Sequence, residues 1–582
     1  MADSGRAVAG APSKNEHLKA GSNALRGSLA EELAREGDSI NGPAANLLKF
    51  HGVYQQDDRD RRAELRHAGE GGRQHMFMVR TKLPAGDVSG ATYLELDRLA
   101  GKYANGTLRI TTRQDIQLHG VLKRDLRRTL REINDALVTT LGACGDVVRN
   151  VVCCPAPTDE NAWLQLLETA HALSDHFLPR TRAYAELFLD GEPFDQSSTG
   201  TDAAEQEPFY GAAYLPRKFK IGLALPHDNC IDVHTNDLGL LAVLERGRLH
   251  GWDLLAGGGL GMSFGVRTTY PRLASPIAFV PAEELFAAVE AVVAIQRDFG
   301  NRSDRKLARL KYLIDDWGIE RFREELGRRL GHTPALPVNP PVTGIADHLE
   351  RGEQPDGRLF LGLHVENGRI RDDQQSRLRS ALRLAVERFN LDLRFTPQQN
   401  VLLTNIRRED EHALLALLAE HGVAVEPPLP ARRAAMACPA LPTCGLALAD
   451  AERALPAVVD DLEELLIHLG LGAEPLSIRM TGCPNGCARP WVADIGLVGR
   501  TGGAYNIYVG GNPEGTRLNG LVAELVPAQR VTATLRPLFE MFRLDRQGSE
   551  GFGDFCDRVG HATLAQEVER AVKADPAFAA AD

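Results

Sequence analysis

The sequence lacks long hydrophobic runs and a secretory leader. Nowhere do about 18 apolar residues follow one another, which is the length that a membrane-spanning helix needs. The first residues, MADSGRAVAGAPSKNE, do not place an apolar stretch after a basic one, as a signal peptide does. We therefore expect a cytoplasmic protein that has no membrane partner.

Cysteine and net positive charge are also scarce. The nine cysteines among 582 residues are few and odd in number, so a disulfide framework is a poor interpretation, and reduced thiols or metal-bound thiolates fit better. The formal net charge of −11 argues against nucleic acid and anionic membranes as partners. Any anion must then bind in a local basic pocket.

Nucleotide-binding motifs are missing as well. The Gly-rich run at 257–261, GGGLG, has the wrong spacing for a dinucleotide fingerprint, and no P-loop sequence occurs. The chain therefore offers no evident site for NADPH, a flavin or a nucleoside triphosphate.

What the sequence does contain is typical of a large globular protein of mixed class. Its length predicts roughly four domains or lobes, and its 43% hydrophobic residues supply a sizeable core. Alternating segments such as TLRITTRQDIQLHGV and FKIGLALP predict strands. Apolar residues at helical spacing predict helices near 28–35, 92–104, 124–140, 160–177, 281–298, 304–330, 372–388, 409–421, 450–469 and 531–544.

An internal repeat divides the chain. Leu108–Leu118 matches Leu393–Leu403, and the sequence Asp237–Leu240 matches Asp494–Leu497. Such a long period indicates two fused homologous halves that face each other across a pseudo-two-fold axis, with a shared site between them. The first copy carries an extra loop around Asp190–Glu207, and Pro-rich segments mark boundaries at His332–Val342 and Glu426–Pro430.

Four cysteines of the second half form two close pairs. Cys438 and Cys444 are separated by five residues, and Cys483 and Cys487 by three. Four thiolates from two loops suit the corners of a [4Fe–4S] cluster, and the Pro and Gly between the last pair favour a tight turn with N–H groups toward sulfur. A structural zinc ion is the alternative, although the wider pair exceeds the usual spacing of about two to four residues.

At these cysteines the chain resembles the sulfite and nitrite reductases that contain sirohaem and a [4Fe–4S] cluster. Within that family it is most similar to the haemoprotein (beta) subunits of NADPH-dependent assimilatory sulfite reductases. The resemblance rests on motifs in the same order along nearly the whole chain: KFHGVYQQDDRDRR at 49–62, TTRQDIQLHG at 111–120, PRTRAYAE at 179–186, YLPRKFK at 214–220, GNRSDRK at 300–306, TGCPNGCARP at 481–490 and EGFGDF at 550–555.

The resemblance implies an α+β fold of two pseudo-symmetric repeats, with paired ferredoxin-like units in a central domain and two flanking α/β lobes. The implied division is an N-terminal arm for partner docking (1–45), a first ferredoxin-like half (46–145), a first lobe for sirohaem and substrate (146–340), a second ferredoxin-like half (341–425), and a second lobe with the cluster cysteines and the tail (426–582). It also implies that the sulfur of Cys487 bridges the cluster and the sirohaem iron.

Basic residues in strand-like contexts supply the expected anion pocket. The resemblance assigns substrate binding on the distal side of sirohaem to Arg80, Arg149, Lys218 and Lys220. Lys218 and Lys220 share one face of a strand because they are two residues apart. Crowded by other cations, they should have lowered pKa values that suit repeated proton delivery to sulfite.

Sirohaem carries eight carboxylates, so the resemblance implies further cationic and polar contacts. The candidates are Arg113, Gln117, His119, Arg217, Asn301, Lys306, Arg309 and Asn485. Four of them have plainer interpretations: His119 as a core histidine, Arg217 as a solvated charge, and the pair Lys306 and Arg309 as an exposed helix face. Some relatives carry a Tyr–Cys link near the substrate, for which Tyr54 and Cys154 are the sequence candidates.

The expected activity is the six-electron reduction of sulfite to sulfide for cysteine biosynthesis. Nitrite reduction is the alternative, and Lys220 favours sulfite because relatives specialised for nitrite tend to have Asn there. A non-catalytic zinc or cluster scaffold is the alternative from another class. By resemblance the electron donor is an NADPH-dependent flavoprotein with FAD and FMN, with ferredoxin as the other candidate.

Overall fold

A computed structural model describes residues 10–158, 161–181, 183, 188–189, 192–193 and 207–574, with the backbone alone at 188–189 and 192–193. The extra loop expected at Asp190–Glu207 lies almost entirely outside the described residues. So do the first nine residues of the expected arm and the last eight of the tail. No helix among the described residues is long and apolar enough to span a membrane.

Two antiparallel five-stranded sheets form the centre, and each takes one strand from the other half of the chain. In the first sheet, order β1-β2-β5-β4-β14, the last strand comes from the second repeat; in the second, order β12-β13-β16-β15-β3, the last strand comes from the first. This exchange ties the repeats together. The strands are β1 Val53–Asp57, β2 His75–Arg80, β3 Asp87–Val88, β4 Leu108–Ile110, β5 Ile116–Val121, β12 Arg351–Glu353, β13 Leu359–Leu363, β14 Arg369–Ile370, β15 Asp392–Phe395 and β16 Val401–Ile406.

The two sheets are flanked by helices at equivalent positions of the repeats. These are α5 Gly90–Tyr103 and α6 Lys123–Asp135 in the first, and α11 Leu378–Phe389 and α12 Glu411–Glu420 in the second. An ion pair of 2.5 Å between Asp97 on α5 and Arg379 on α11 joins the two halves. The matched segments Leu108–Leu118 and Leu393–Leu403 are the β4–β5 and β15–β16 hairpins, which confirms the repeat.

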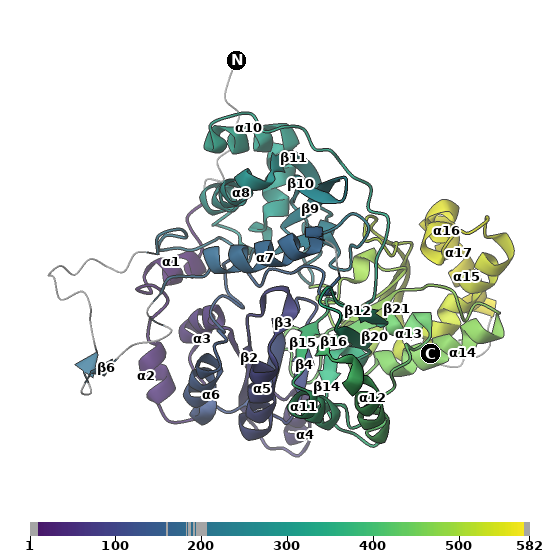
Figure 1. Ribbon diagram of the computed structural model, residues 1–582, viewed down its shortest axis with the longest axis horizontal. Helices are drawn as coiled ribbons and strands as arrows, with labels where there is room; N and C mark the ends of the chain where they lie inside the picture. The colour runs from purple at the N-terminus through teal and green to yellow at the C-terminus, as the bar shows by residue number, and fades with distance from the viewer. Residues whose placement is uncertain are drawn as a thin grey trace.

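Each lobe contains a mixed sheet of its own. The first has order β11-β10-β9-β8 and the second β17-β18-β19-β20-β21, and in both the early strands are parallel and the later ones antiparallel. Figure 1 shows the first lobe at the top and the second at the right of the central sheets. The strands are β8 Ile221–Ala224, β9 Leu238–Glu245, β10 Arg248–Ala256, β11 Ser275–Pro281, β17 Met436–Ala437, β18 Ile478–Thr481, β19 Ile495–Thr501, β20 Ala504–Val509 and β21 Gly520–Pro527.

The second sequence match marks the same point of both lobes. Asp237 and Asp494 directly precede β9 and β19, and each carboxylate accepts a 2.9 Å hydrogen bond from the N–H that precedes the neighbouring parallel strand, at Lys220 and Ser477. A buried carboxylate thus fixes the start of two strands at once. The mixed α/β fold with two repeated halves is therefore confirmed.

The lobe helices at 161–176, 285–299, 455–468 and 531–545 match predicted ranges, whereas those at 430–433, 552–559 and 561–574 have no predicted counterpart. Residues 304–330 do not form a single helix: Gly318, with φ +75°, separates α9 from α10, and the first residues form a short 3-10 turn. A left-handed glycine interrupts the ladder of a regular helix, which the apolar period alone did not reveal. The lobe helices are α7 Asn161–His176, α8 Leu285–Phe299, α9 Leu310–Trp317, α10 Ile319–Leu330, α13 Pro430–Arg433, α14 Leu455–His468, α15 Val531–Asp545, α16 Phe552–Val559 and α17 His561–Ala574.

The N-terminal segment packs on the rest of the chain over its described part. It forms α1 Lys14–Ala20, α2 Leu29–Ala34 and α3 Gly42–Leu48, of which the sequence pattern anticipated only α2. Leu25 and Leu47 are buried, and Lys19 Nζ donates to the Leu215 carbonyl oxygen at 2.6 Å. Residues 14–48 are therefore integral to the fold, and any docking role of the arm remains a prediction. A further unanticipated helix, α4 (Arg59–His67), follows β1.

Two hydrophobic cores support this arrangement. One contains residues between Leu25 and Val423 and unites the central sheets with the first lobe, and the other contains residues between Ala431 and Val568. A small cluster of Leu260, Trp491, Val492 and Val498 connects the lobes. The second lobe thus has a core of its own and meets the first lobe through this small apolar cluster together with buried charged contacts.

Candidate functional site

The four cysteines predicted to hold a cluster come together at one edge of the second lobe sheet. Cys438 follows β17 and Cys483 follows β18, and these two strands are parallel, so their carboxyl ends lie side by side. The backbone N–H of Gly482 lies 3.3 Å from Cys438 Sγ, and Asn485 Nδ2 lies 3.5 Å from Cys483 Sγ. N–H groups therefore point at sulfur, as the sequence predicted.

The turn between Cys483 and Cys487 depends on its glycine. Gly486 has φ +62°, and a Cβ atom at this position would lie 2.1 Å from Trp491 Cζ3. Any other residue would be both strained and in collision with a buried indole. The tight turn expected from the Pro-Asn-Gly sequence is thus present, and Trp491 holds it in place.

The donor set fits an iron–sulfur cluster. All nine cysteines lie within the described residues and are free. Burial raises the pKa of Cys483 to about 12, and negative charge on Cys487 and Cys444 contributes to that rise. Burial and the same neighbours raise the pKa of Cys438 as well. Four thiolates this close repel one another, so a cationic core such as four irons is needed to stabilise them.

A single zinc ion fits the same sulfurs poorly. Among the described residues, the group whose donor atoms all lie within 4.8 Å of one another is a different one, which includes Cys154. Four irons hold their cysteine sulfurs farther apart than one ion does. The spacing therefore favours the cluster over the zinc alternative.

Cys487 faces the basic residues. It is exposed, whereas Cys438 and Cys483 are buried and Cys444 is half-buried. Its charge acts on Arg80 and on Lys218, which belong to the other half of the chain. The sulfur predicted to bridge the two cofactors is thus the one that opens toward the predicted substrate residues.

Lys218 and Lys220 lie just before β8, at the interface of the lobes. Burial and the nearby Arg309 and Arg217 lower the pKa of Lys218 to about 7. Burial and Lys218 itself lower the pKa of Lys220 well below its usual value. Both side chains keep part of their surface accessible, as residues that line a cavity do. The lowered pKa values expected from the sequence are present.

Arg80 of the central domain and Arg149 of the first lobe are the other two predicted substrate residues. Arg80 ends β2, and its Nη1 donates to Cys144 Sγ at 3.4 Å. Arg149 donates from Nε to the Gly145 carbonyl oxygen at 2.8 Å and from Nη1 to the Ala143 carbonyl oxygen at 3.3 Å, and these two contacts fix the direction of its side chain. All four predicted substrate residues therefore belong to one electrostatic environment, although their roles remain a prediction.

Of the residues predicted to contact sirohaem carboxylates, three are engaged within the protein. Arg113 donates to Asn236 Oδ1 at 2.9 Å and to two carbonyl oxygens. Arg309 forms a buried bidentate pair with Asp237 at 2.7 and 2.8 Å. The amide oxygen of Asn301 accepts from its own turn. These contacts give the three a positioning role, whether or not they also touch the cofactor.

Of the other sirohaem candidates, His119 and Gln117 contact each other, and Arg217 and Lys306 are at least partly accessible to solvent. His119 is buried, and its Nε2 lies 3.1 Å from the Gln117 amide, which also reaches Arg80 Nε. Burial lowers the pKa of His119 well below its usual value, so its imidazole is neutral, as in a core histidine. Arg217 is half-buried, and Lys306 is exposed.

The cysteine beside Tyr54 is Cys144. Burial and the nearby Cys144 thiol raise the pKa of Tyr54, and Cys144 also accepts from Arg80. Cys154 instead lies beside Asp228 and His348. The structure therefore brings Cys144, and not the sequence candidate Cys154, beside Tyr54.

Sequence reasoning missed two groups at this interface. Asp115 is buried near Arg80 and Arg113, and burial raises its pKa to about 7. Asp232 pairs with Arg479 and Arg489 at 2.6 Å each and so joins the lobes. The motif TTRQD contains the first, but nothing in the local sequence of Asp232 indicates a partner 247 residues away.

Comparison with known sequences places this architecture in a family. The sequence model described as the nitrite and sulphite reductase 4Fe-4S domain matches residues 144–334 and 430–575. The model of the nitrite/sulfite reductase ferredoxin-like half domain matches residues 70–136 and 351–421. The chain belongs to the nitrite and sulfite reductase family, and the resemblance found from its motifs is confirmed.

Among its relatives are proteins named sulfite reductase [NADPH] hemoprotein beta-component. One from Myxococcus xanthus is 45% identical, with 94% of this chain and 97% of the relative covered, and one from Geobacillus kaustophilus is 44% identical, with 95% and 97% covered. A protein of Synechococcus elongatus named sulfite reductase [ferredoxin] is 44% identical, with 95% and 90% covered. The solved structure of the Mycobacterium tuberculosis NirA protein superposes with a TM-score of 0.75 at 25% identity, covering 94% of this chain and 97% of NirA.

Proposed function

We propose that this protein catalyses the six-electron reduction of sulfite to sulfide in assimilatory sulfur metabolism leading to cysteine. The observation that carries the proposal is the meeting of Cys487 with Arg80 and Lys218, which come from different halves of the chain. The names of the relatives support it, since those from Myxococcus and Geobacillus are sulfite reductase hemoproteins.

The residues fit the two cofactors that the resemblance implies. Cys438, Cys444, Cys483 and Cys487 would hold the [4Fe–4S] cluster, and basic residues around the lobe interface would hold the carboxylates of sirohaem. When bound, these groups would pass on the electrons that a donor protein supplies and would provide the metal site at which sulfur is reduced. Cys487 is the exposed member of the four, which supports the proposal that its thiolate would serve both cofactors.

The chain itself contributes charge and protons. Sulfite is an anion, and its transfer from water into a largely buried cavity requires compensating positive charge, which Arg80 and Arg149 supply as fixed cations. Lys218, with a pKa near 7, is about half protonated at neutral pH and can give up a proton and regain it. Asp115 lies near Arg80 and Arg149, and burial raises its pKa to about 7. These groups match a reaction that consumes protons repeatedly.

An electron-donor protein is required, because the sequence contains no evident nucleotide or flavin motif. We propose an NADPH-dependent flavoprotein with FAD and FMN, as the names of most relatives suggest. The Synechococcus relative, named for ferredoxin, makes ferredoxin the alternative. A cytoplasmic location is part of the same proposal and agrees with nine free cysteines.

The test is sulfide production by protein loaded with sirohaem and cluster, with reduced methyl viologen as donor. We expect sulfite-dependent oxidation of the dye, stoichiometric sulfide, and a higher kcat/KM for sulfite than for nitrite. A Lys220→Met variant should lose activity with a changed pH profile while retaining both cofactors. Fully loaded protein that makes ammonia from nitrite but no sulfide would show that the nitrite alternative is correct.

A further inference from the structure

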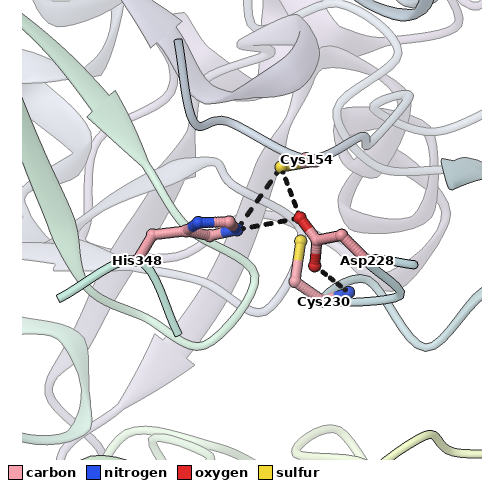
Figure 2. Close-up of side chains that lie close together, drawn as sticks. All are labelled: Cys154, Asp228, Cys230 and His348. Carbon is pink, nitrogen blue, oxygen red and sulfur yellow. Dashed lines mark hydrogen bonds and ion pairs between the residues drawn. The ribbon is translucent and has the colours of Figure 1, made fainter. Parts of the chain in front are cut away.

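A second group of metal-ligand side chains lies away from the cluster cysteines. Cys154, Asp228, Cys230 and His348 place one donor atom each within 4.8 Å of all the others. Figure 2 shows the two sulfurs, one carboxylate oxygen and one imidazole nitrogen turned toward one another. None of these four residues has a part in the proposed reduction.

The four side chains come from three separate segments. Cys154 follows the short bridge between Val152 and Gly222, and Asp228 and Cys230 lie in the loop after β8. His348 lies in the connection between the two halves of the chain, shortly before β12. The fold has therefore gathered these residues from positions up to 194 apart in sequence.

The distances fit the edges of a small coordination tetrahedron. Cys154 Sγ is 2.8 Å from Asp228 Oδ2 and 3.3 Å from His348 Nε2, and these two atoms are 3.1 Å apart. With zinc bonds of about 2.0 Å to N or O and about 2.3 Å to S, tetrahedral geometry puts neighbouring donors roughly 3.3–3.8 Å apart. To accommodate the ion, the separation of Cys154 Sγ from Asp228 Oδ2 would widen by about 0.7 Å, and the other two separations by about 0.2 Å each.

The imidazole is oriented for a shared centre and not for a proton relay. A relay of the Cys–His–Asp type uses both ring nitrogens, one toward the thiol and one toward the carboxylate. In this group the same nitrogen, Nε2 of His348, faces both Cys154 and Asp228. Donors that converge on one point are the arrangement that a metal ion requires.

Backbone hydrogen bonds hold the Asp228 carboxylate in one orientation. Asp228 Oδ1 accepts hydrogen bonds of 3.2 Å from the backbone N–H groups of Cys230 and Ala346. These contacts fix the carboxylate so that Oδ2 points into the group, which is how outer contacts orient metal ligands. His348 itself has φ +58°, a left-handed backbone that its position in the connection imposes.

The four ligand side chains are buried, and two of their donor atoms are soft thiolate sulfurs. Cys154, Cys230, Asp228 and His348 are between 1% and 8% exposed, which leaves little room for a substrate. Two thiolates with an imidazole favour zinc over calcium or magnesium, and four protein ligands without an open position are typical of structural zinc. A buried carboxylate with two thiolates also needs positive charge beside it.

We propose that Cys154, Asp228, Cys230 and His348 bind one structural zinc ion, which fastens the connection between the halves to the first lobe. Two backbone contacts already place the connection along this loop, from Thr343 N to the Pro226 oxygen at 2.8 Å and from Asn229 N to the Gly344 oxygen at 3.0 Å. The ion adds a crosslink at the end of this pairing, where the chain passes into the second ferredoxin-like half.

The experiment is elemental analysis of the holoprotein purified without chelators, because mass spectrometry separates zinc from the iron of the other cofactors. We expect about one zinc per chain in the wild type. Zinc-edge X-ray absorption should show two sulfur neighbours at about 2.3 Å together with N or O neighbours at about 2.0 Å.

Two variants and a matched control test the ligands. Cys230→Ala and His348→Asn, the latter chosen because Asn tolerates the left-handed backbone, should lower the zinc content at least tenfold. Cys153→Ala removes the neighbouring buried thiol, which is not a ligand, and should leave the content unchanged. If either ligand variant fails to fold, the zinc-edge X-ray absorption spectrum of the wild-type protein still tests the proposed ligands. The proposal would be overturned if wild-type protein held no zinc after incubation with zinc chloride, or if a Cys154–Cys230 disulfide were found in place of the ion. Zinc retained in both ligand variants would overturn it as well.

Discussion

We predict that the buried ion triad of Asp232, Arg479 and Arg489 contributes strongly to the stability of the contact between the two lobes. One carboxylate oxygen of Asp232 lies 2.6 Å from Arg479 Nη1 and 2.6 Å from Arg489 Nε, and all three side chains are buried. Arg489 also donates to the Pro397 carbonyl oxygen at 3.0 Å, so the triad reaches the central domain. It is the charged contact at which first lobe, second lobe and central sheet meet.

Replacement of Asp232 by Asn isolates the effect of its charge. Asp232 has φ +51°, a conformation that Asn adopts as readily, and the Asn amide oxygen still accepts a hydrogen bond. The substitution leaves two buried guanidinium groups without a counter-charge, and breaking a buried pair in this way costs about 3–5 kcal/mol. We expect about 3 kcal/mol, because one acceptor remains.

The assay is thermal unfolding of the cofactor-loaded protein followed by circular dichroism. For a cooperative unit of about 150–250 residues, each kcal/mol shifts Tm by roughly 2–4 °C, so the second lobe should unfold about 6–12 °C earlier. Asp554→Asn is the matched control, since its 2.7 Å pair with Arg517 is exposed and contributes about 1 kcal/mol or less. A shift no larger for Asp232→Asn than for Asp554→Asn would refute the reasoning.

Three further predictions concern pH and the cluster turn. Burial lowers the pKa of Lys82 to about 8. Between about pH 8 and 10 the unfolded chain therefore binds more protons than the folded protein, and the free energy of unfolding rises with pH. In urea titrations, Lys82→Met should reduce this rise by at most about 1.4 kcal/mol per pH unit. Glu452 is half-buried, and its contacts with Arg109 and Arg369 hold its pKa at about 2. Its stabilisation is present above about pH 4.5 and is lost as the pH falls toward 2, so Glu452→Gln should remove about 3 kcal/mol of the acid dependence. An unchanged acid-unfolding curve would contradict this. Gly486→Ala should abolish most acid-labile sulfide because of the collision with Trp491, whereas Gly502→Ala, where a Cβ meets nothing within 4 Å, should retain it.

The sequence by itself determined the fold class and the repeat, and it singled out the four cysteines that we propose as cluster ligands. Hydrophobic period and strand alternation are local properties, and they located α5, α7, α8 and α15 within a few residues. Repeat matches such as Asp237 with Asp494 reflect the same local need, a carboxylate that caps two parallel strands. The Pro and Gly between cysteines likewise act within a single turn.

Only the tertiary structure decided which distant groups meet. Periodicity carried no sign of the strand exchange between the central sheets, of the Asp232 triad, or of the helices α1 and α3, because their stability comes from contacts with residues far along the chain. The same reason explains why the sequence did not indicate that Cys144 lies beside Tyr54 and that Cys154 faces His348. Local spacing fixes the order of residues along one element, whereas the neighbours of a buried side chain depend on how separate elements pack.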